Sequence, residues 1–249
     1  MESKVTKSCR RKRSRLRLAA LLLAGLLGLA ATFVAAWMRA RRSEVVALVQ
    51  QPPPTTAFIQ DYLHRAQSEG LPPPDWRWVS YQQISPSVKR AVVAAEDLGF
   101  FSHRGFELGE VRAAVLDTLR EGKPLRGAST ITQQLAKNLW LSPKRSAWRK
   151  LEEAILVIQL ERHLSKRRIL EIYLNVVELG PGIYGVEAAA QRHFGRSAAE
   201  LDEAEAAALA ATLPRPGSWH PRSESRAYRL HVDRIRLRME RADWLRKLV

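Results

Sequence analysis

The chain has 249 residues, of which 46% are hydrophobic and 27% charged; this composition is typical of a globular protein and excludes a disordered one. Its 41 Lys and Arg against 25 Asp and Glu give a formal net charge of +16. The single cysteine, Cys9, excludes an intramolecular disulfide framework. The six histidines show no metal-ligand spacing, so the sequence predicts no dedicated metal site.

The positive charge is concentrated at the N-terminus. Residues 1–42 contain eleven basic side chains and one acidic one, which leaves a net charge of only +6 for the rest of the chain. A nucleic-acid partner is therefore not indicated by the overall charge. The basic residues flank an apolar segment instead, which is typical of a membrane-targeting region.

The apolar segment, residues 18–38, has 21 residues and no charged side chain. A helix of that length can cross the hydrocarbon core of a membrane. Eight basic residues precede the segment and three follow it, so the positive-inside rule places residues 1–17 in the cytoplasm and everything after Met38 outside. A cleaved signal peptide is the alternative, but its apolar core is usually shorter.

Residues 39–75 are expected to form a juxtamembrane connector, because Pro triplets at 52–54 and 72–74 bracket one short amphipathic stretch. From Trp76 onward, apolar residues recur at helical spacing with little strand-like alternation. Residues 76–249 are therefore predicted to form a mainly α domain with a basic amphipathic C-terminal helix from about Arg226 to Lys247. Sequence signals for helix N-caps occur at Ser85, Thr130, Ser146, Ser165 and Asp202.

Two acidic residues are placed where a solvated carboxylate is not expected. Glu96, followed by Asp97, ends an apolar helix, where the helix dipole disfavours negative charge and should raise the pKa of a carboxyl group. Glu153 falls on an apolar stripe of its predicted helix, whereas Glu152 falls on a polar arc. The alternatives are a solvated helix end for Glu96 and a structural ion pair with Arg149 or Lys150 for Glu153.

Residues 127–150 combine a Gly, two hydroxyl side chains and a helix N-terminus with a group of following cations, which is a pattern suited to binding phosphate or diphosphate. An ordinary capped helix with a basic surface is the alternative. Paired carboxylates suit work at a glycosidic carbon, and a membrane tether suits a lipid-borne substrate. Together these features favour an exported, membrane-tethered enzyme that acts on a lipid-linked, phosphorylated sugar.

The order of motifs between Trp76 and Pro216 resembles that of the monofunctional biosynthetic peptidoglycan transglycosylases, relatives of the glycosyltransferase domain of bifunctional penicillin-binding proteins. The segments that carry the resemblance are EDLGFFSHRG at 96–105, GASTITQQ at 127–134 with Lys137-Asn138, RKLEE at 149–153 and KRRILEIYLN at 166–175. The family implies a lysozyme-like helical glycosyltransferase domain with one N-terminal transmembrane helix. It implies a single-pass protein of the bacterial inner (cytoplasmic) membrane with a periplasmic catalytic domain.

The resemblance also implies the activity: a peptidoglycan polymerase that elongates glycan chains from lipid II by inverting β-1,4 glycosyl transfer, releasing undecaprenyl diphosphate. Glu96 would be the general base that deprotonates the acceptor 4-hydroxyl. Glu153 would assist departure of the diphosphate directly, through neighbouring cations or through a bound Mg²⁺ or Mn²⁺, with no covalent cofactor required. By the same resemblance, the residues that bind the donor sugar and diphosphate would be Ser129, Gln133, Lys137, Arg145, Arg149, Lys150 and Arg112. The residues that support the cleft structurally would be Asp97, His103, Glu171 and Asn175.

The expected partners are lipid II, the lipid-linked glycan chain, the membrane, and proteins of cell-wall synthesis or division, but not nucleic acid. Only 33 residues follow Pro216, so no transpeptidase activity is expected. Two alternatives stay open at this point. One is a lysozyme-like enzyme that cleaves glycan, and the other is a non-catalytic, membrane-anchored cell-wall scaffold.

Overall fold

The computed structural model describes residues 3–107, 129–141 and 147–249 and divides the chain into two compact units, residues 1–44 and 45–249. Helix α1 runs from Ser3 to Ala47, so it forms the first unit and contributes the start of the second. Residues 18–38 lie within it. Among the residues described, no helix is both long and apolar enough to cross a membrane.

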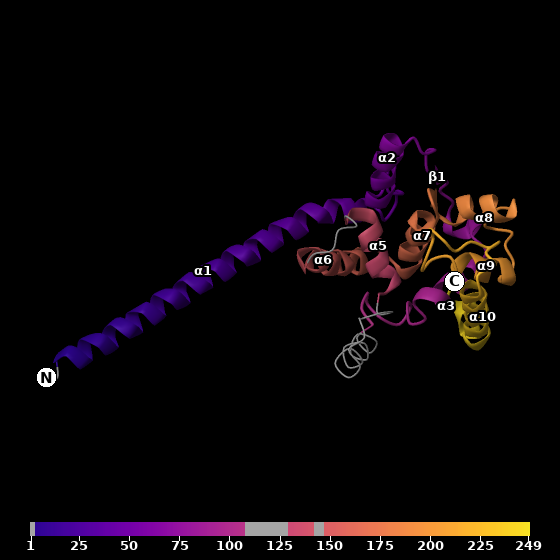
Figure 1. Ribbon diagram of the computed structural model, residues 1–249. Coiled ribbons are helices and arrows are strands. Elements are labelled where there is room, and N and C mark those ends of the chain that lie inside the picture. The colour runs from indigo at the N-terminus through magenta and orange to yellow at the C-terminus, as the bar shows by residue number, and fades with distance from the viewer. Residues whose placement is uncertain (1–2, 108–128, 142–146) are drawn as a thin grey trace. The chain divides into compact units, whose positions relative to one another are not determined.

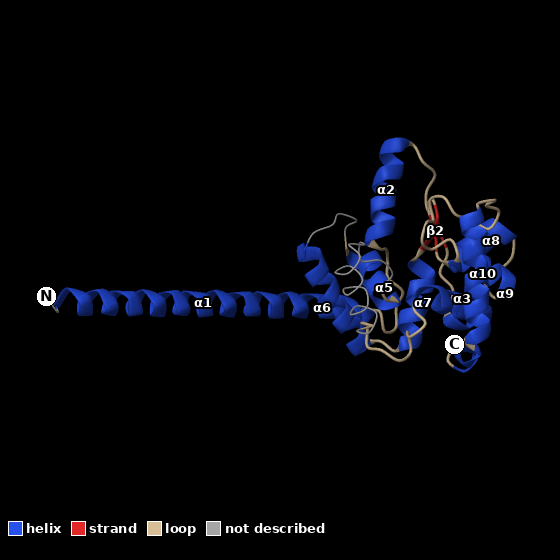
Figure 2. Ribbon diagram, turned by 60° about the horizontal axis from the view of Figure 1, so that its bottom comes forward, coloured by secondary structure: helices blue, strands red, loops and turns tan. Residues whose placement is uncertain are grey.

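The described part of the second unit is mainly helical, as the sequence predicted (Figures 1 and 2). Two 3-10 helices, η1 (Tyr81–Gln83) and η2 (Asp243–Lys247), accompany the longer helices. The α-helices described in this unit are α2 (Ala57–Glu69), α3 (Pro86–Glu96), α5 (Ile131–Trp140), α6 (Ala147–His163), α7 (Lys166–Val176), α8 (Val186–Phe194), α9 (Glu203–Ala210) and α10 (Arg226–Arg241).

Side chains at the predicted N-caps begin four of these helices. Ser85 and Ser165 each accept a hydrogen bond from the backbone three residues on, while Thr130 and Asp202 form capping boxes. The predicted cap at Ser146 lies outside the described residues. The C-terminal helix is shorter than predicted, since α10 ends at Arg241 and the chain continues as 3-10 helix η2.

A small sheet was not anticipated from the sequence. Strand β1 (Asp75–Trp76) pairs in parallel with β3 (Ile183–Tyr184), and β2 (Glu178–Gly180) pairs antiparallel with β3, in the order β1-β3-β2. Strands of two or three residues are too short to show the alternation on which a sequence-based strand prediction depends. Through this sheet, the segment that ends at Trp76 is paired with residues 183–184, more than 100 positions later in the chain.

Helix α2 and strand β1 belong to the same compact unit as the rest of the domain, although α2 and the first residue of β1 lie in the segment expected to be a connector. Three residues of α2, Ile59, Tyr62 and Ala66, form a core cluster with Tyr184 of β3. The edge-to-face contact of Tyr62 with Tyr184, with ring centroids 6.0 Å apart, fixes this packing. The second Pro triplet therefore leads directly into the folded domain.

The helices that carry the predicted site are held by two packing groups. Helix α5 packs against α6 and α7, and helix α3 packs against α9 and α10. In the second group, Arg90 of α3 donates to the carbonyl of Met239 near the end of α10 at 3.0 Å. Arg238 of α10 donates in return to the carbonyls of Ala94 and Ala95 at the end of α3, both at 3.3 Å. Each helix thus supplies a cation to the C-terminal end of the other.

Candidate active site

Glu96 is the last residue of α3, and its carboxylate is held by an amide from another helix. Its Oε2 accepts a 2.6 Å hydrogen bond from Nε2 of Gln134 on α5. Burial raises the pKa of Glu96. The hydrogen bond from Gln134 and the charges of Lys137 and Arg238 act in the opposite direction. The pKa is raised as the sequence predicted, but burial rather than the helix end is the main cause.

The amide of Gln134 has a second partner. Its Oε1 accepts a 2.8 Å hydrogen bond from the hydroxyl of Tyr173 on α7. Burial raises the pKa of Tyr173 well above its usual value, and the charges of Glu96 and Asp97 add to that effect. The phenol is therefore a neutral donor at physiological pH. A continuous chain of hydrogen bonds connects Tyr173 through Gln134 to Glu96.

Lys137, on α5, is close enough to both predicted catalytic carboxylates to interact with them electrostatically. Burial lowers the pKa of Lys137, Glu153 and Glu96 raise it, and the cations Arg149 and Lys150 lower it. Its ammonium group also lies 5.7 Å from the ring centroid of Phe58. Lys137 therefore interacts electrostatically with both Glu96 and Glu153.

Glu153 is the buried glutamate of the RKLEE segment, as its position on the apolar stripe predicted. The residue is 4% exposed, whereas Glu152 is only partly buried. It forms an ion pair with Lys150 one turn earlier on α6, so the structural ion pair considered from the sequence is also present. The carboxylate of Glu153 thus has two cations near it, the exposed Lys150 and the more buried Lys137.

The N-terminus of α5, predicted as an anion site, is already occupied by groups of the chain itself. The backbone N–H of Ile131 donates to Asp97 at 3.0 Å, and that of Gln133 donates to the Thr130 hydroxyl at 3.2 Å. The carboxylate of Asp97 thus takes the place in which an anionic ligand was expected. The N-terminus of α5 therefore does not present these two N–H groups to a ligand.

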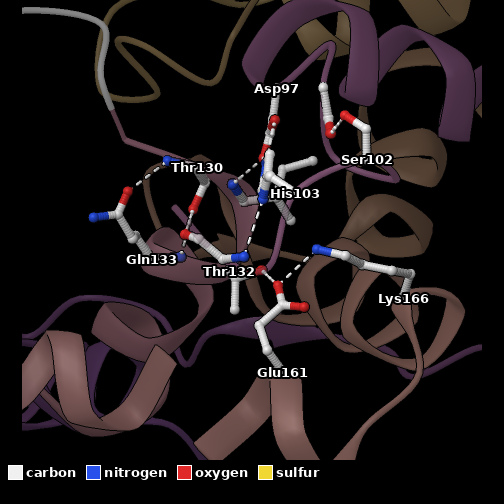
Figure 3. A network of polar contacts seen from close by, with 11 residues as sticks. Asp97, Ser102, His103, Thr130, Thr132, Gln133, Glu161 and Lys166 are labelled. Atoms are coloured by element: carbon white, nitrogen blue, oxygen red, sulfur yellow. Dashed lines mark hydrogen bonds and ion pairs between the residues drawn. The ribbon is translucent and has the colours of Figure 1, made fainter. Parts of the chain in front are cut away.

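Asp97 is also the centre of a network that joins α3, α5, α6 and α7 (Figure 3). His103 contacts it through Nε2 at 2.9 Å, and the backbone N–H of Gly105 donates to Nδ1 of the same ring at 3.0 Å. Nδ1 is therefore an acceptor, and the proton lies on Nε2 facing Asp97. At the other end of the network, Glu161 accepts from Thr132 at 2.5 Å and from Lys166 at 2.7 Å.

Glu171 and Asn175 hold the segment before α3 against α7. Glu171 accepts from the backbone N–H of Tyr81 at 3.0 Å and pairs with Arg168 at 2.7 Å. Asn175, fully buried, accepts from the N–H of Val79 and donates to its carbonyl. All these contacts are within the protein, and the supporting role of both residues stays a prediction.

The other predicted binding residues differ in how deeply they are buried. Ser129 is exposed just before the cap of α5, and Arg149 is partly buried on α6. Gln133 is buried and uses its Oε1 to accept from the N–H of Thr130 in the capping box, so its side chain is partly committed to the helix start. Arg112 and Arg145 lie outside the described residues.

Sequence reasoning assigned no role to three residues that surround Glu96. Gln134 could have been identified from the sequence, because it belongs to the GASTITQQ motif and directly follows Gln133, which was predicted to bind substrate. Tyr173 lies on the apolar face of α7, where an aromatic residue is expected for packing alone. Arg238 is distant in the chain and is identified only by the packing of α10 on α3.

Comparison with known proteins places the chain in a family. Residues 66–240 match the family model described as Transglycosylase, which is more than half of the chain. The chain is 50% identical over 195 residues to the biosynthetic peptidoglycan transglycosylase of Azoarcus sp. (strain BH72), covering 77% of this chain and 83% of that protein. The protein of the same description from Methylobacillus flagellatus is 45% identical over 199 residues, covering 78% and 86%. That from Alcanivorax borkumensis is 51% identical over 173 residues, covering 70% and 68%.

Proposed function

The chain belongs to the transglycosylase family, and we propose that Glu96 is the general base with which it polymerises glycan chains from lipid II. It is a peptidoglycan glycosyltransferase of cell-wall synthesis. The observation that best supports the assignment is a carboxylate with a raised pKa, Glu96, that shares Lys137 with the second buried carboxylate, Glu153. A base whose pKa is moved toward neutrality is suited to remove a hydroxyl proton in the transition state.

In the proposed reaction, Glu96 takes the proton from the 4-hydroxyl of N-acetylglucosamine on the incoming lipid II. The oxygen forms a bond to the anomeric carbon of the lipid-linked growing chain, and the bond from that carbon to the diphosphate breaks. Attack from the opposite face inverts the configuration, which yields a β-1,4 linkage and undecaprenyl diphosphate. The proton stays on Glu96 until it passes to solvent.

The departing diphosphate gains negative charge that the cationic side of the site can stabilise. Lys137 and Arg149 are proposed to bind it, with Lys150 pairing either Glu153 or the diphosphate. Among the described residues no three His, Cys, Asp or Glu side chains gather as in a metal site. Mg²⁺ or Mn²⁺ would therefore be held mainly by diphosphate oxygens, with Glu153 as its candidate protein ligand, and would supply further charge neutralisation.

Polymerisation of labelled lipid II by the full-length protein tests the assignment. Glu96→Gln should reduce glycan formation by about 10²–10⁴-fold, because the amide cannot accept the proton. Glu153→Gln should also reduce it, while Glu152→Gln on the same helix serves as the matched control and should leave it nearly unchanged. Shortening of preformed glycan by the native protein would support the cleaving alternative. A folded native protein without any product would support the scaffold.

We further propose that the domain is lysozyme-like in fold and that residues 18–38 anchor it in the inner membrane with the domain on the periplasmic side. The uncharged run and its basic flanks support the anchor. Cys9, the single cysteine, provides a direct test. A membrane-impermeant maleimide should label Cys9 only after the membrane is permeabilised. In a Cys9→Ser background, exposed Ser218→Cys should be labelled without permeabilisation, and the reverse pattern would exclude this topology.

A further inference from the structure

Gln134 contacts Glu96 with one end of its amide and a buried tyrosine with the other. Its Nε2 lies 2.6 Å from Glu96 Oε2, and its Oε1 lies 2.8 Å from the hydroxyl of Tyr173. Tyr173 is fully buried in α7, so its side chain has no access to a substrate. The tyrosine therefore influences the reaction only through its neighbours.

We propose that Tyr173 is a positioning residue that fixes the orientation of the Gln134 amide, so that Gln134 presents its N–H rather than its oxygen to Glu96. The proposal rests on the assignment of Glu96 as the general base. In this arrangement Gln134 donates a hydrogen bond to the carboxylate form, which is the form that can accept the acceptor-sugar proton.

The reasoning starts from the near-symmetry of a glutamine amide, whose oxygen and nitrogen can exchange places by a half-turn. In the structure, the Tyr173 hydroxyl donates to Oε1 of Gln134. After a half-turn, Nε2 would donate to the tyrosine oxygen, and the hydroxyl proton of Tyr173 would have no acceptor among the contacts described. A buried donor without an acceptor is costly, so Tyr173 disfavours the turned amide.

The turned amide would also change the protonation state of the base. Its Oε1 would face an oxygen of Glu96 at hydrogen-bond distance, and two acceptors can share that contact only if Glu96 is protonated. Protonated Glu96 cannot act as a base. The hydroxyl of Tyr173 thus keeps Glu96 active by excluding an amide orientation that would stabilise the inactive form.

The other charged groups around Glu96 set the background for a pH test. Asp97 follows it on the chain, Lys137 faces it from α5 and Arg238 faces it from α10. Burial raises the pKa of Glu96, and the Gln134 hydrogen bond is the first of the effects that lower it. Loss of a fixed Gln134 orientation should therefore raise the pKa, and the acid limb of the rate profile should move to higher pH.

The experiment measures lipid II polymerisation by full-length Tyr173→Phe across a range of pH. The substitution removes one oxygen and keeps the ring, and we expect kcat near neutral pH to fall on the order of tenfold with little change in KM. Activity should recover partly at higher pH. Tyr228→Phe is the matched control, because it removes another buried hydroxyl, bonded at 2.7 Å to the carbonyl of Ala208, and should leave the pH profile unchanged.

Gln134→Met supplies an independent measurement that does not depend on the folding of Tyr173→Phe. It removes the amide, so its acid limb should move in the same direction, and adding Tyr173→Phe to it should cause no further shift. An unchanged limb in either single variant, or effects that multiply in the double variant, would overturn the inference. Full activity of Glu96→Gln would instead show that the assignment of the base is wrong.

Discussion

Replacement of Asn175 by alanine should destabilise the whole domain, because this fully buried side chain connects two distant segments. Its Oδ1 accepts from the N–H of Val79 at 2.8 Å, and its Nδ2 donates to the carbonyls of Val79 at 2.9 Å and Glu171 at 2.8 Å. Asn175→Ala removes all three hydrogen bonds. It also leaves the N–H of Val79 without its acceptor.

Three hydrogen bonds at about 1 kcal/mol each give an expected loss of about 3 kcal/mol in the free energy of unfolding. For a domain of this size, that corresponds to a decrease in Tm of roughly 6–12 °C. The loss should be nearly independent of pH, because none of the three bonds involves a titrating group.

Thermal unfolding followed by circular dichroism measures the effect. Gln191→Ala is the control, since it removes one hydrogen bond, to Glu187 at 3.1 Å, from a less buried amide and should cost at most about 1 kcal/mol. If Asn175→Ala lowered the Tm no more than Gln191→Ala does, the hydrogen bonds of Asn175 would not be what holds the segment before α3 in place.

Three further predictions concern the surroundings of Glu96, the proposed base, and the turn beside Asn175. Arg238→Gln removes a positive charge that lowers the pKa of Glu96, so the acid limb of polymerisation should move to higher pH. Asp97→Asn removes a negative charge that raises the same pKa, so the limb should move to lower pH while the Tm falls. Gly185→Ala places a Cβ at φ 80° and ψ 157°, a region reserved for glycine, and 2.5 Å from the carbonyl oxygen of Asn175; thermal unfolding should show a loss of about 3 kcal/mol.

The arginine and glycine substitutions each have a control in the same chain. Arg234→Gln replaces an exposed arginine of α10 that bonds to its own helix, and it should not move the acid limb. Gly217→Ala adds a Cβ that meets no atom within 4 Å and should leave the Tm nearly unchanged. A shift of the Asp97→Asn and Arg238→Gln limbs in the same direction would contradict the electrostatic explanation.

Local sequence signals predicted the helices well because their cause is local. A cap is decided by a side chain and an amide two or three residues away, so Ser85, Thr130, Ser165 and Asp202 could be identified without any knowledge of the fold. The burial of Glu153 followed for the same reason, since the periodicity of a single helix separates it from Glu152.

Contacts between distant segments could not be predicted in this way. The strands of the small sheet are too short to show a period, and β1 pairs with a partner more than 100 residues away. The occupation of the α5 N-terminus by Asp97 depends on how two helices meet. The same is true of the hydrogen bonds from Tyr173 and Gln134, which become visible only when α5, α7 and the end of α3 are in place.

Helices α3 and α10 each donate an arginine hydrogen bond to a carbonyl near the end of the other, and these contacts can form only late in synthesis of the chain. Arg238 follows the carbonyl of Ala94 by 144 residues, and Arg90 precedes the carbonyl of Met239 by 149. During synthesis, Glu96 therefore emerges long before the helix that supports its end of α3. A chain that is still being made carries the proposed base without this support. The contacts that hold the end of α3 against α10 can therefore form only after the C-terminal part of the domain has been synthesised.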